Sequence, residues 1–392
     1  MEGLSRDMRP LYIPLIVASV AVAVLFVAMV PQFPKITTSL EKLATQPEKT
    51  EKAVAQAQVT VMTTRLAGGV ELRYVVSPDE IVSGGPPKDG IPSIDKPRFA
   101  SAEQAESFMR ADELVVGLYH KGVARAYPLK ILVWHEIVND VVAGDPIVVT
   151  YCPLCYTSTA FIRVLEGEPV EFGVSGKLYN SDLVMYDRKT DTYWSQIWGV
   201  AILGKLAGQA LQRIQVDVMT WEKWKNLHPD TEVLTTETGF SRPYGRDPYA
   251  ATGYYTDTQI WFPVKNRDDR LHPKAIVHGI IIGGKVKVYE EKSIANAKLM
   301  NDNVAETPIL VVSPMEQFVR AYSRVVDGHV LEFEWRDDKI FDKQTGSEWS
   351  VYGEAVAGPL KGKSLQQIVV FPGFWFAWVA FFPSLKLYSG NM

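Results

Sequence analysis

Cysteine is scarce in this chain: Cys152 and Cys155 are the only two in its 392 residues. A disulfide-rich framework of the kind that holds small secreted domains together is therefore excluded. The sequence also lacks a Gly-rich phosphate loop, a Rossmann fingerprint and a nucleophile elbow, so no nucleotide cofactor is expected. The net charge of −4 argues against nucleic acid as a partner.

One long hydrophobic run is present near the start, Leu11–Val30, and it contains no charged residue. At about 1.5 Å per helical residue, it matches a hydrocarbon core of roughly 30 Å. Arg6 and Arg9 precede the run, which keeps the N-terminus in the cytoplasm by the positive-inside tendency. A cleaved signal peptide is the alternative, but no small-x-small pattern follows. We expect an uncleaved single-pass anchor in the cell membrane, with the main body periplasmic or extracellular.

Composition divides the chain into four segments. Residues 1–34 hold the cytoplasmic start and the anchor, and residues 35–57 are polar and predict a stalk. Residues 58–265 and 266–392 are each rich in short β-branched runs separated by turn residues, which is typical of strands. The expected fold class is α+β, predominantly β, with two fused repeat-related domains after an N-terminal transmembrane helix.

The two predicted domains share a pattern that returns after about 160 residues, which is typical of an internal repeat. The matched residues include Asp187, Thr190 and Trp194 with Asp342, Thr345 and Trp349, and Asn139-Asp140 with Asn301-Asp302. Residues kept in both copies are expected to serve the fold. The positions of His135, Cys152 and Cys155 are occupied in the second copy by Ala297, Ser313 and Glu316. The first copy alone is therefore expected to carry the chemistry.

The strand-like run before Cys152 places the Cys-Pro-Leu-Cys sequence at a turn. Two thiols at this spacing can close on each other, bind one metal ion or exchange electrons. Two thiolates with the imidazole of His135 suit copper or zinc, which makes Cys152, Cys155 and His135 the candidate metal ligands, with a fourth ligand unidentified. His120 joins this site if its strand lies beside the motif.

A dithiol redox centre at Cys152 and Cys155 is the second interpretation, and it predicts a redox or membrane-protein partner. If the chain is an enzyme, both interpretations make it a thiol/disulfide or metal-dependent oxidoreductase. The third interpretation is a structural disulfide in a membrane-tethered binding or assembly module. Closing so short a loop contributes only about 2 kcal/mol.

A segment that the second copy largely lacks, 172–182, is expected to be a loop. Its polar residues are Ser175, Lys177, Asn180 and Asp182. They either orient a ligand or the thiols, or only form turns. The aromatic run Phe371–Phe382 contains Pro372 and is too short to span a bilayer, so it is expected in the core or at a domain seam.

Five motifs in order suggest a family. They are Ala126–Leu129, His135–Asp140, Tyr151–Cys155, Phe172–Gly176 and Tyr179–Leu183. Over roughly residues 90 to 385 the chain resembles the prokaryotic domain-of-unknown-function 3179 family. The resemblance implies no established activity, but selenoproteins among the relatives imply redox chemistry at the corresponding site. The chain departs from the family at Asp191, where relatives tend to have Gly-Ser; the second copy keeps Gly346-Ser347.

Overall fold

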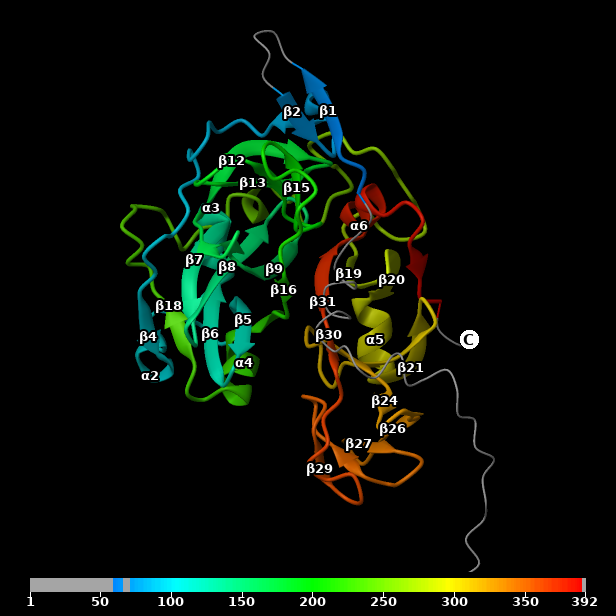
Figure 1. Cartoon of the computed structure of the whole chain (residues 1–392). Helices are drawn as coiled ribbons and strands as arrows, with labels where there is room; N and C mark the ends of the chain where they lie inside the picture. Colours follow the sequence, from blue (N-terminus) through cyan, green and yellow to red (C-terminus); the bar gives the residue numbers. More distant parts are fainter. Residues whose placement is uncertain (1–58, 66–70, 390–392) are drawn as a thin grey trace, which may run out of the picture. The chain divides into compact units, whose positions relative to one another are not determined.

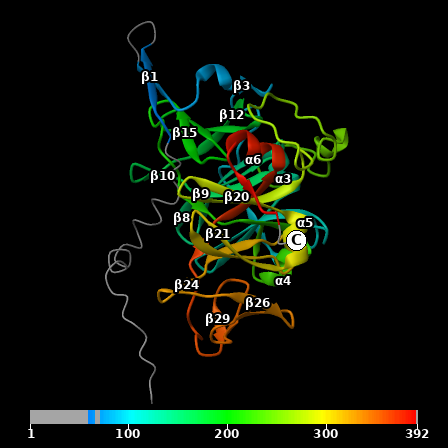
Figure 2. The same cartoon turned by 90° about the vertical axis from the view of Figure 1, so that its right-hand side faces the viewer.

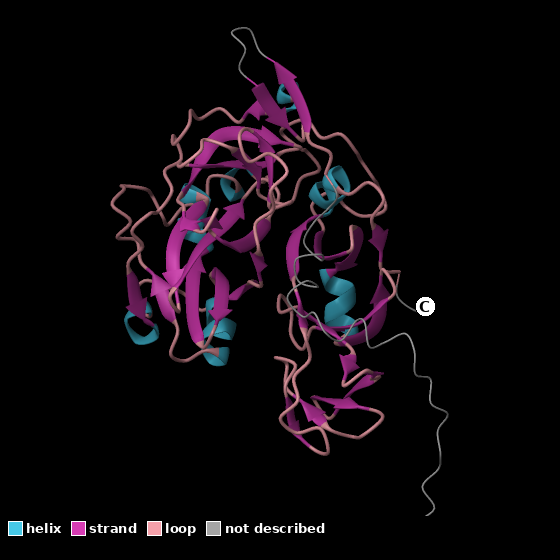
Figure 3. Cartoon of the chain, in the orientation of Figure 1, coloured by secondary structure: helices cyan, strands magenta, loops and turns pink. Residues whose placement is uncertain are grey.

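The computed structural model describes residues 59–65 and 71–389, which belong to the compact unit Glu48–Met392. The predicted anchor and stalk lie outside the described residues. Strands dominate and the helices are short, so the protein is predominantly β, as the sequence predicts (Figures 1 and 3). Within the described ranges, no helix has the length and apolar character needed to cross a membrane.

A first series of elements forms two sheets around one short helix. It runs through β5 (Leu114–His120), β6 (Val123–Pro128), α3 (Leu129–His135), β7 (Ile137–Val142), β8 (Asp145–Cys152) and β9 (Thr157–Ile162). The β7–β8–β9 sheet is extended by β16 (Arg213–Ile214), and β5–β6 by β17 (Asp217–Thr220), β18 (Glu232–Leu234) and β4 (Phe99–Ser101). Leu118, Ile131 and Val149 are fully buried in one apolar cluster from both sheets and α3. This packing fixes the end of β8.

The first series also forms a third sheet. Its strands are β12 (Phe172–Tyr179), β13 (Asp182–Asp187), β14 (Tyr193–Ser195), β15 (Val200–Leu203), β1 (Met62–Arg65), β2 (Glu71–Tyr74) and β3 (Val82–Ser83). The turn Asn180-Ser181 joins β12 to β13, and both residues have positive φ, at 51° and 65°. Two successive positive φ values are typical of a tight two-residue hairpin turn.

A second series follows in the same order. It runs through β19 (Ile276–Ile282), β20 (Lys285–Glu290), α5 (Glu291–Ala297), β21 (Leu299–Val304), β22 (Thr307–Val312), β23 (Arg320–Ser323), β26 (Phe333–Arg336), β27 (Lys339–Asp342), β28 (Glu348–Trp349) and β29 (Ala355–Ala357). Two pairs of residues make the same bond: the indole N–H of Trp194 donates to Asp187 over 3.0 Å, and that of Trp349 to Asp342 over 3.0 Å.

The backbone register of the two series differs from the predicted alignment by one residue. The N–H of Tyr151 donates to Glu136 O at 2.8 Å, and the N–H of Ser313 donates to Lys298 O at 2.7 Å. Ser313 therefore takes the place of Tyr151 and not that of Cys152. The connection from this position to the next strand is one residue shorter in the second series, and the sequence comparison put that difference in the wrong place.

Late in each series a strand is followed by a short helix: β17 by α4 (Trp221–Leu227), and β31 (Val370–Phe374) by α6 (Trp375–Phe381), the red helix of Figure 2. A tryptophan from each helix packs flat on a glycine. A Cβ added at Gly117 would lie 2.2 Å from Trp224, and one at Gly279 would lie 2.1 Å from Trp378. Since no side chain fits there, glycine is required by packing. The residues of α6 are all buried, which agrees with the predicted core position.

The remaining elements are short. They are α2 (Ala102–Ala105), η1 (Pro78–Glu80), η2 (Ala250–Thr252), β10 (Val164–Leu165), β11 (Glu168–Pro169), β24 (Val325–Val326), β25 (His329–Val330), β30 (Gln367–Ile368) and β32 (Lys386–Leu387). A capping box begins α2 at Ser101: its hydroxyl accepts from the Gln104 N–H, and the Gln104 side chain accepts from the Ser101 N–H. In the described part of the chain, no sheet pairs a strand before residue 265 with one after it.

Candidate functional site

The two cysteines lie at one turn of the first series. Cys152 is the last residue of β8, and Cys155 follows in the turn before β9. The N–H of Cys155 donates to Cys152 O at 3.2 Å, which closes the turn. Both side chains are buried free thiols. Their Sγ atoms and a carboxylate oxygen of Asp182 all lie within 4.8 Å of one another. The turn therefore presents both sulfurs to one carboxylate.

Asp182 reaches this position because it is the first residue of β13, directly after the Asn180-Ser181 turn. Its Oδ2 accepts from the Ile197 N–H at 3.0 Å, and the carbonyl of Ser181 accepts from the Cys155 S–H at 3.1 Å. The segment 172–182, predicted as a loop, is instead strand β12 followed by this tight turn. The prediction missed the strand because Gly and Ser residues in it form a bulge.

Glu136 is a second acid beside the sulfurs. It follows α3 with φ at 58°, and its side chain is buried. Among the residues that the structure describes, its carboxyl group has no hydrogen bond or ion pair. Burial and then the charge of Asp182 raise the pKa of Glu136 to about 8. Lys298 holds the corresponding place in the second series, and this change of charge sign within the repeat is the signal that could have identified Glu136.

The structure does not bring His135 into the sulfur group. Its Nδ1 donates to Pro92 O at 2.7 Å, and its Nε2 contacts the Tyr244 hydroxyl at 2.7 Å. Since a carbonyl can only accept, the proton lies on Nδ1 and the Tyr244 hydroxyl donates to Nε2. Burial lowers the pKa of His135, which keeps the ring neutral. His120 is engaged elsewhere, with its Nε2 2.5 Å from Asp145 Oδ2.

The site is rich in acidic groups and poor in positive charge. Burial raises the pKa of both thiols, that of Cys155 well above its usual value. Burial also raises the pKa of Asp182 to about 7, although the Ile197 N–H opposes this. No ion pair to Asp182 or Glu136 exists within the described ranges. Burial disfavours the charged forms of these thiols and carboxyl groups. A cation bound among them would stabilise the charged forms, and the ionised groups would in turn bind the cation strongly.

Arg213 is a partly buried cation on which the charge of Asp182 acts. The hydrogen bonds of its guanidinium go to atoms other than the sulfurs: it donates to Ile197 O at 2.6 Å and to Thr159 Oγ1 at 2.5 Å. Burial lowers the pKa of Arg213 to about 9, and the charge of Asp182 raises it. Ile197 thus lies between the two charges, since its N–H binds Asp182 and its C=O binds Arg213.

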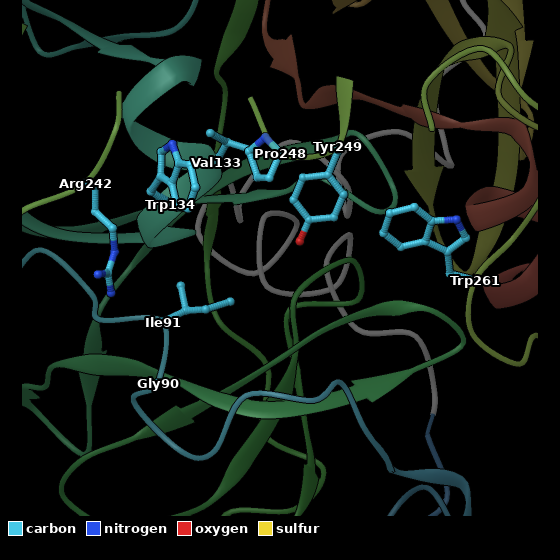
Figure 4. A pocket seen from close by; sticks show the side chains of 8 residues that line it. All are labelled: Gly90, Ile91, Val133, Trp134, Arg242, Pro248, Tyr249 and Trp261. Carbon is cyan, nitrogen blue, oxygen red and sulfur yellow. The ribbon is translucent and has the colours of Figure 1, made fainter. Parts of the chain in front are cut away.

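One cavity reaches the cysteine turn, and a second cavity lies beside the first. The smaller, of about 130 Å³, is lined by Glu136, Leu154 and Lys177 among others. The larger, of about 300 Å³, is lined by Gly90, Ile91, Val133, Trp134, Arg242, Pro248, Tyr249 and Trp261 (Figure 4). Both include Ile91, Tyr249 and Trp261, so they are neighbours. Because Leu154 lies between the two cysteines in the chain, the smaller cavity extends to their turn.

The segment 235–275 covers the cysteine turn. It contains one short helical turn, η2, and no strand. The hydroxyl of Tyr254 donates to Leu154 O at 2.8 Å, and the buried ammonium of Lys274 donates to Tyr254 O. Segments of this length without regular structure are usually functional in compact domains. Its aromatic density, with Tyr249, Tyr254 and Trp261 in a polar context, is the sequence signal that was missed.

The second series contributes to the same site. The N–H of Phe374 donates to Cys155 O at 2.7 Å, and the Phe374 ring stacks on Tyr156 with centroids 5.3 Å apart. The Asn180 amide donates to Ala380 O in α6 at 3.2 Å. β31 and α6 therefore support the cysteine turn and the Asn180-Ser181 turn from outside.

Comparison with known proteins gives one family match. The family described as protein of unknown function (DUF3179) matches residues 88–385. No curated protein and no solved structure matches the chain.

Proposed function

We propose that this chain, which belongs to the DUF3179 family of proteins of unknown function, binds one transition metal ion through Cys152, Cys155 and Asp182. The observation that carries the proposal is the convergence of two sulfurs and a carboxylate oxygen within 4.8 Å. Thiolate and carboxylate both bind zinc, at about 2.3 Å and 2.0–2.2 Å. Copper in its reduced state prefers sulfur alone, so the carboxylate favours zinc over copper.

The adjoining acid gives the site a further chemical capacity. A metal ion supplies Lewis acidity and lowers the pKa of a water molecule bound to it. Burial raises the pKa of Glu136 to about 8, which suits this carboxyl group to exchange a proton with a molecule in the smaller cavity near neutral pH. The combination is suited to proton transfer beside a metal ion.

Metal content of the purified full chain tests the proposal. We expect about one zinc ion per chain after reduction and exposure to zinc alone, and loss of that ion in Cys152→Ser and Asp182→Asn. Ser313→Ala is the matched control, since Ser313 directly follows β22, the equivalent strand of the second series. Equal metal content in all four proteins, or none in the wild type, would contradict the proposal.

A dithiol redox centre is the second candidate, supported by two sulfurs in one turn. The raised pKa of both thiols weakens it, because exchange proceeds through the thiolate. Thiol titration of the metal-free protein in glutathione buffers separates the two. A reversible two-electron transition between about −300 and −120 mV would favour the redox function.

We further propose that Leu11–Val30 anchors the chain in the cell membrane, with the matched region outside the cytoplasm. We also propose that the two series descend from one duplicated unit. Their common order of elements and the equivalent Trp–Asp bonds support this. In this view the second series has lost or never had the ligands, and it serves to support the first.

A further inference from the structure

We infer that the two adjoining cavities bind a small aromatic carboxylate, with its carboxylate group on Arg242 and its ring beside Tyr249 and Trp261. The inference deepens the proposed function, because it supplies the class of molecule on which the metal site acts. The binding itself requires only the cavity residues. The two ideas can therefore fail separately.

Two cations face the cavities without an acidic partner. Arg242 lines the larger cavity, and among the described residues its guanidinium has no ion pair and one long hydrogen bond, 3.5 Å to Ser241 O. Lys177 lines the smaller cavity, and its ammonium likewise has no ion pair within the described ranges. Arginine presents a planar fork of donors that matches a carboxylate. An anion is therefore the complementary ligand.

The walls between these cations are aromatic and apolar. The rings of Tyr249 and Trp261 stack with centroids 5.8 Å apart and an angle of 25° between their planes. The indole N–H of Trp134 donates to Arg246 O at 3.0 Å, which holds that ring against the cavity. In Figure 4 Arg242 and Trp261 flank the cavity on opposite sides, and the Tyr249 hydroxyl points into the space above Ile91. Flat aromatic rings of this kind stack against other flat rings, so the cavity is suited to a ligand with a planar ring.

The position of the smaller cavity fixes the orientation of the ligand. Glu136 and Leu154 line it, so the end of the ligand away from Arg242 is directed to the cysteine turn. Glu136 lacks a partner among the described residues, and so does the Tyr249 hydroxyl. Buried polar groups in proteins normally have hydrogen-bond partners, so both are available to a ligand. The larger cavity, of about 300 Å³, accommodates one ring system with a short acidic side chain.

Calorimetric titration of the full chain tests the inference with benzoate, phenylacetate and indole-3-acetate, each compared with its neutral amide. We expect at least one acid to bind about tenfold or more tightly than its amide, because only the acid pairs with Arg242. Arg242→Gln should reduce that acid to the affinity of its amide. Arg246→Gln is the matched control, since it keeps the backbone oxygen that holds Trp134. Trp261→Ala should weaken acid and amide alike.

Three results would overturn the inference: no acid binds the folded wild type, acids and amides bind equally, or Arg242→Gln leaves the preference intact. Cys152→Ser separates this result from the metal proposal. Acid binding that persists in Cys152→Ser, together with wild-type protein that takes up no metal, rejects only the metal site. Acid binding lost in Cys152→Ser but retained in Arg242→Gln places the carboxylate on the metal and rejects the assigned orientation.

Discussion

At the scale of single residues, burial without an ion pair sets the pKa values of the acidic groups in the site. Cys152, Cys155, Asp182 and Glu136 are all buried, and burial raises the pKa of each. A divalent cation bound among them would remove this penalty and release protons at the same time. The same buried groups that lower the stability of the metal-free protein thus provide the affinity for the metal ion.

The acidity of Glu136 predicts a pH-dependent stability. Its folded pKa is raised from 4.5 to about 8, so its contribution to folding is favourable at low pH and is lost as the pH rises through that interval. Between about pH 5 and pH 8, the metal-free wild type should lose about 2–4 kcal/mol of unfolding free energy relative to Glu136→Gln. Urea unfolding in the presence of a chelator measures the difference. Parallel pH profiles would show that Glu136 ionises freely in the folded state.

The role of Asp182 predicts a loss of metal affinity that conservative substitution cannot restore. Asp182→Asn keeps the size of the side chain and an acceptor for the Ile197 N–H, but the amide is a weak zinc ligand. We expect the zinc dissociation constant to rise by about tenfold or more, measured by competition with a chromophoric chelator. Asp145→Asn, at a carboxylate bound to His120, is the control and should change nothing. Unchanged affinity in Asp182→Asn would remove the carboxylate from the ligand set.

The sequence identifies the cysteine turn but not its partner. The β-branched pattern predicts the strand that leads to Cys152, and β8 is present but includes Cys152 as its last residue. The partner Asp182 comes from another sheet, and only a tertiary contact brings it near. His135 is close in sequence, but the positive φ of Glu136 turns the chain after α3, so that Glu136 lines the cavity. Proximity in sequence did not predict proximity in space here.

At the scale of elements, the packing of α6 on β19 connects the second series with the site. Gly279→Ala would place a Cβ 2.1 Å from Trp378, which belongs to α6. Phe374 directly precedes α6, and its N–H donates to Cys155 O. We expect a loss of about 1–3 kcal/mol in unfolding free energy from overpacking, measured by denaturant unfolding. Gly245→Ala is the control, because a Cβ at Gly245 meets no atom within 4 Å. Equal stability of the two variants would contradict the described packing.

Some short elements depend on local capping signals, and other segments depend on tertiary contacts. The helix Trp221–Leu227 begins after Thr220 because the threonine hydroxyl accepts from the Lys223 N–H and caps it. The helix after Ser101 is only one turn long and ends at Ala105. The covering segment 235–275 had no predicted role, since its aromatic residues follow neither a helical nor a strand period. Such segments are positioned by contacts such as Tyr254 to Leu154.

At the scale of the whole molecule, the predicted anchor determines where the site operates. If Leu11–Val30 spans the membrane with Arg6 and Arg9 in the cytoplasm, external protease should digest the matched region, residues 88–385, in intact spheroplasts or cells. Full-length chain should also stay in the membrane fraction after an alkaline carbonate wash. Protection from external protease, with digestion only after lysis, would reverse the predicted orientation.

X-ray absorption at the zinc edge of the reduced full chain tests the central claim most directly. The account predicts two sulfur neighbours at about 2.3 Å and at least one oxygen neighbour at about 2.0–2.2 Å. Cys152→Ser should lose one sulfur from this shell, while Ser313→Ala should leave it unchanged. A first shell of nitrogen and oxygen alone in the wild type would contradict a metal site at Cys152, Cys155 and Asp182.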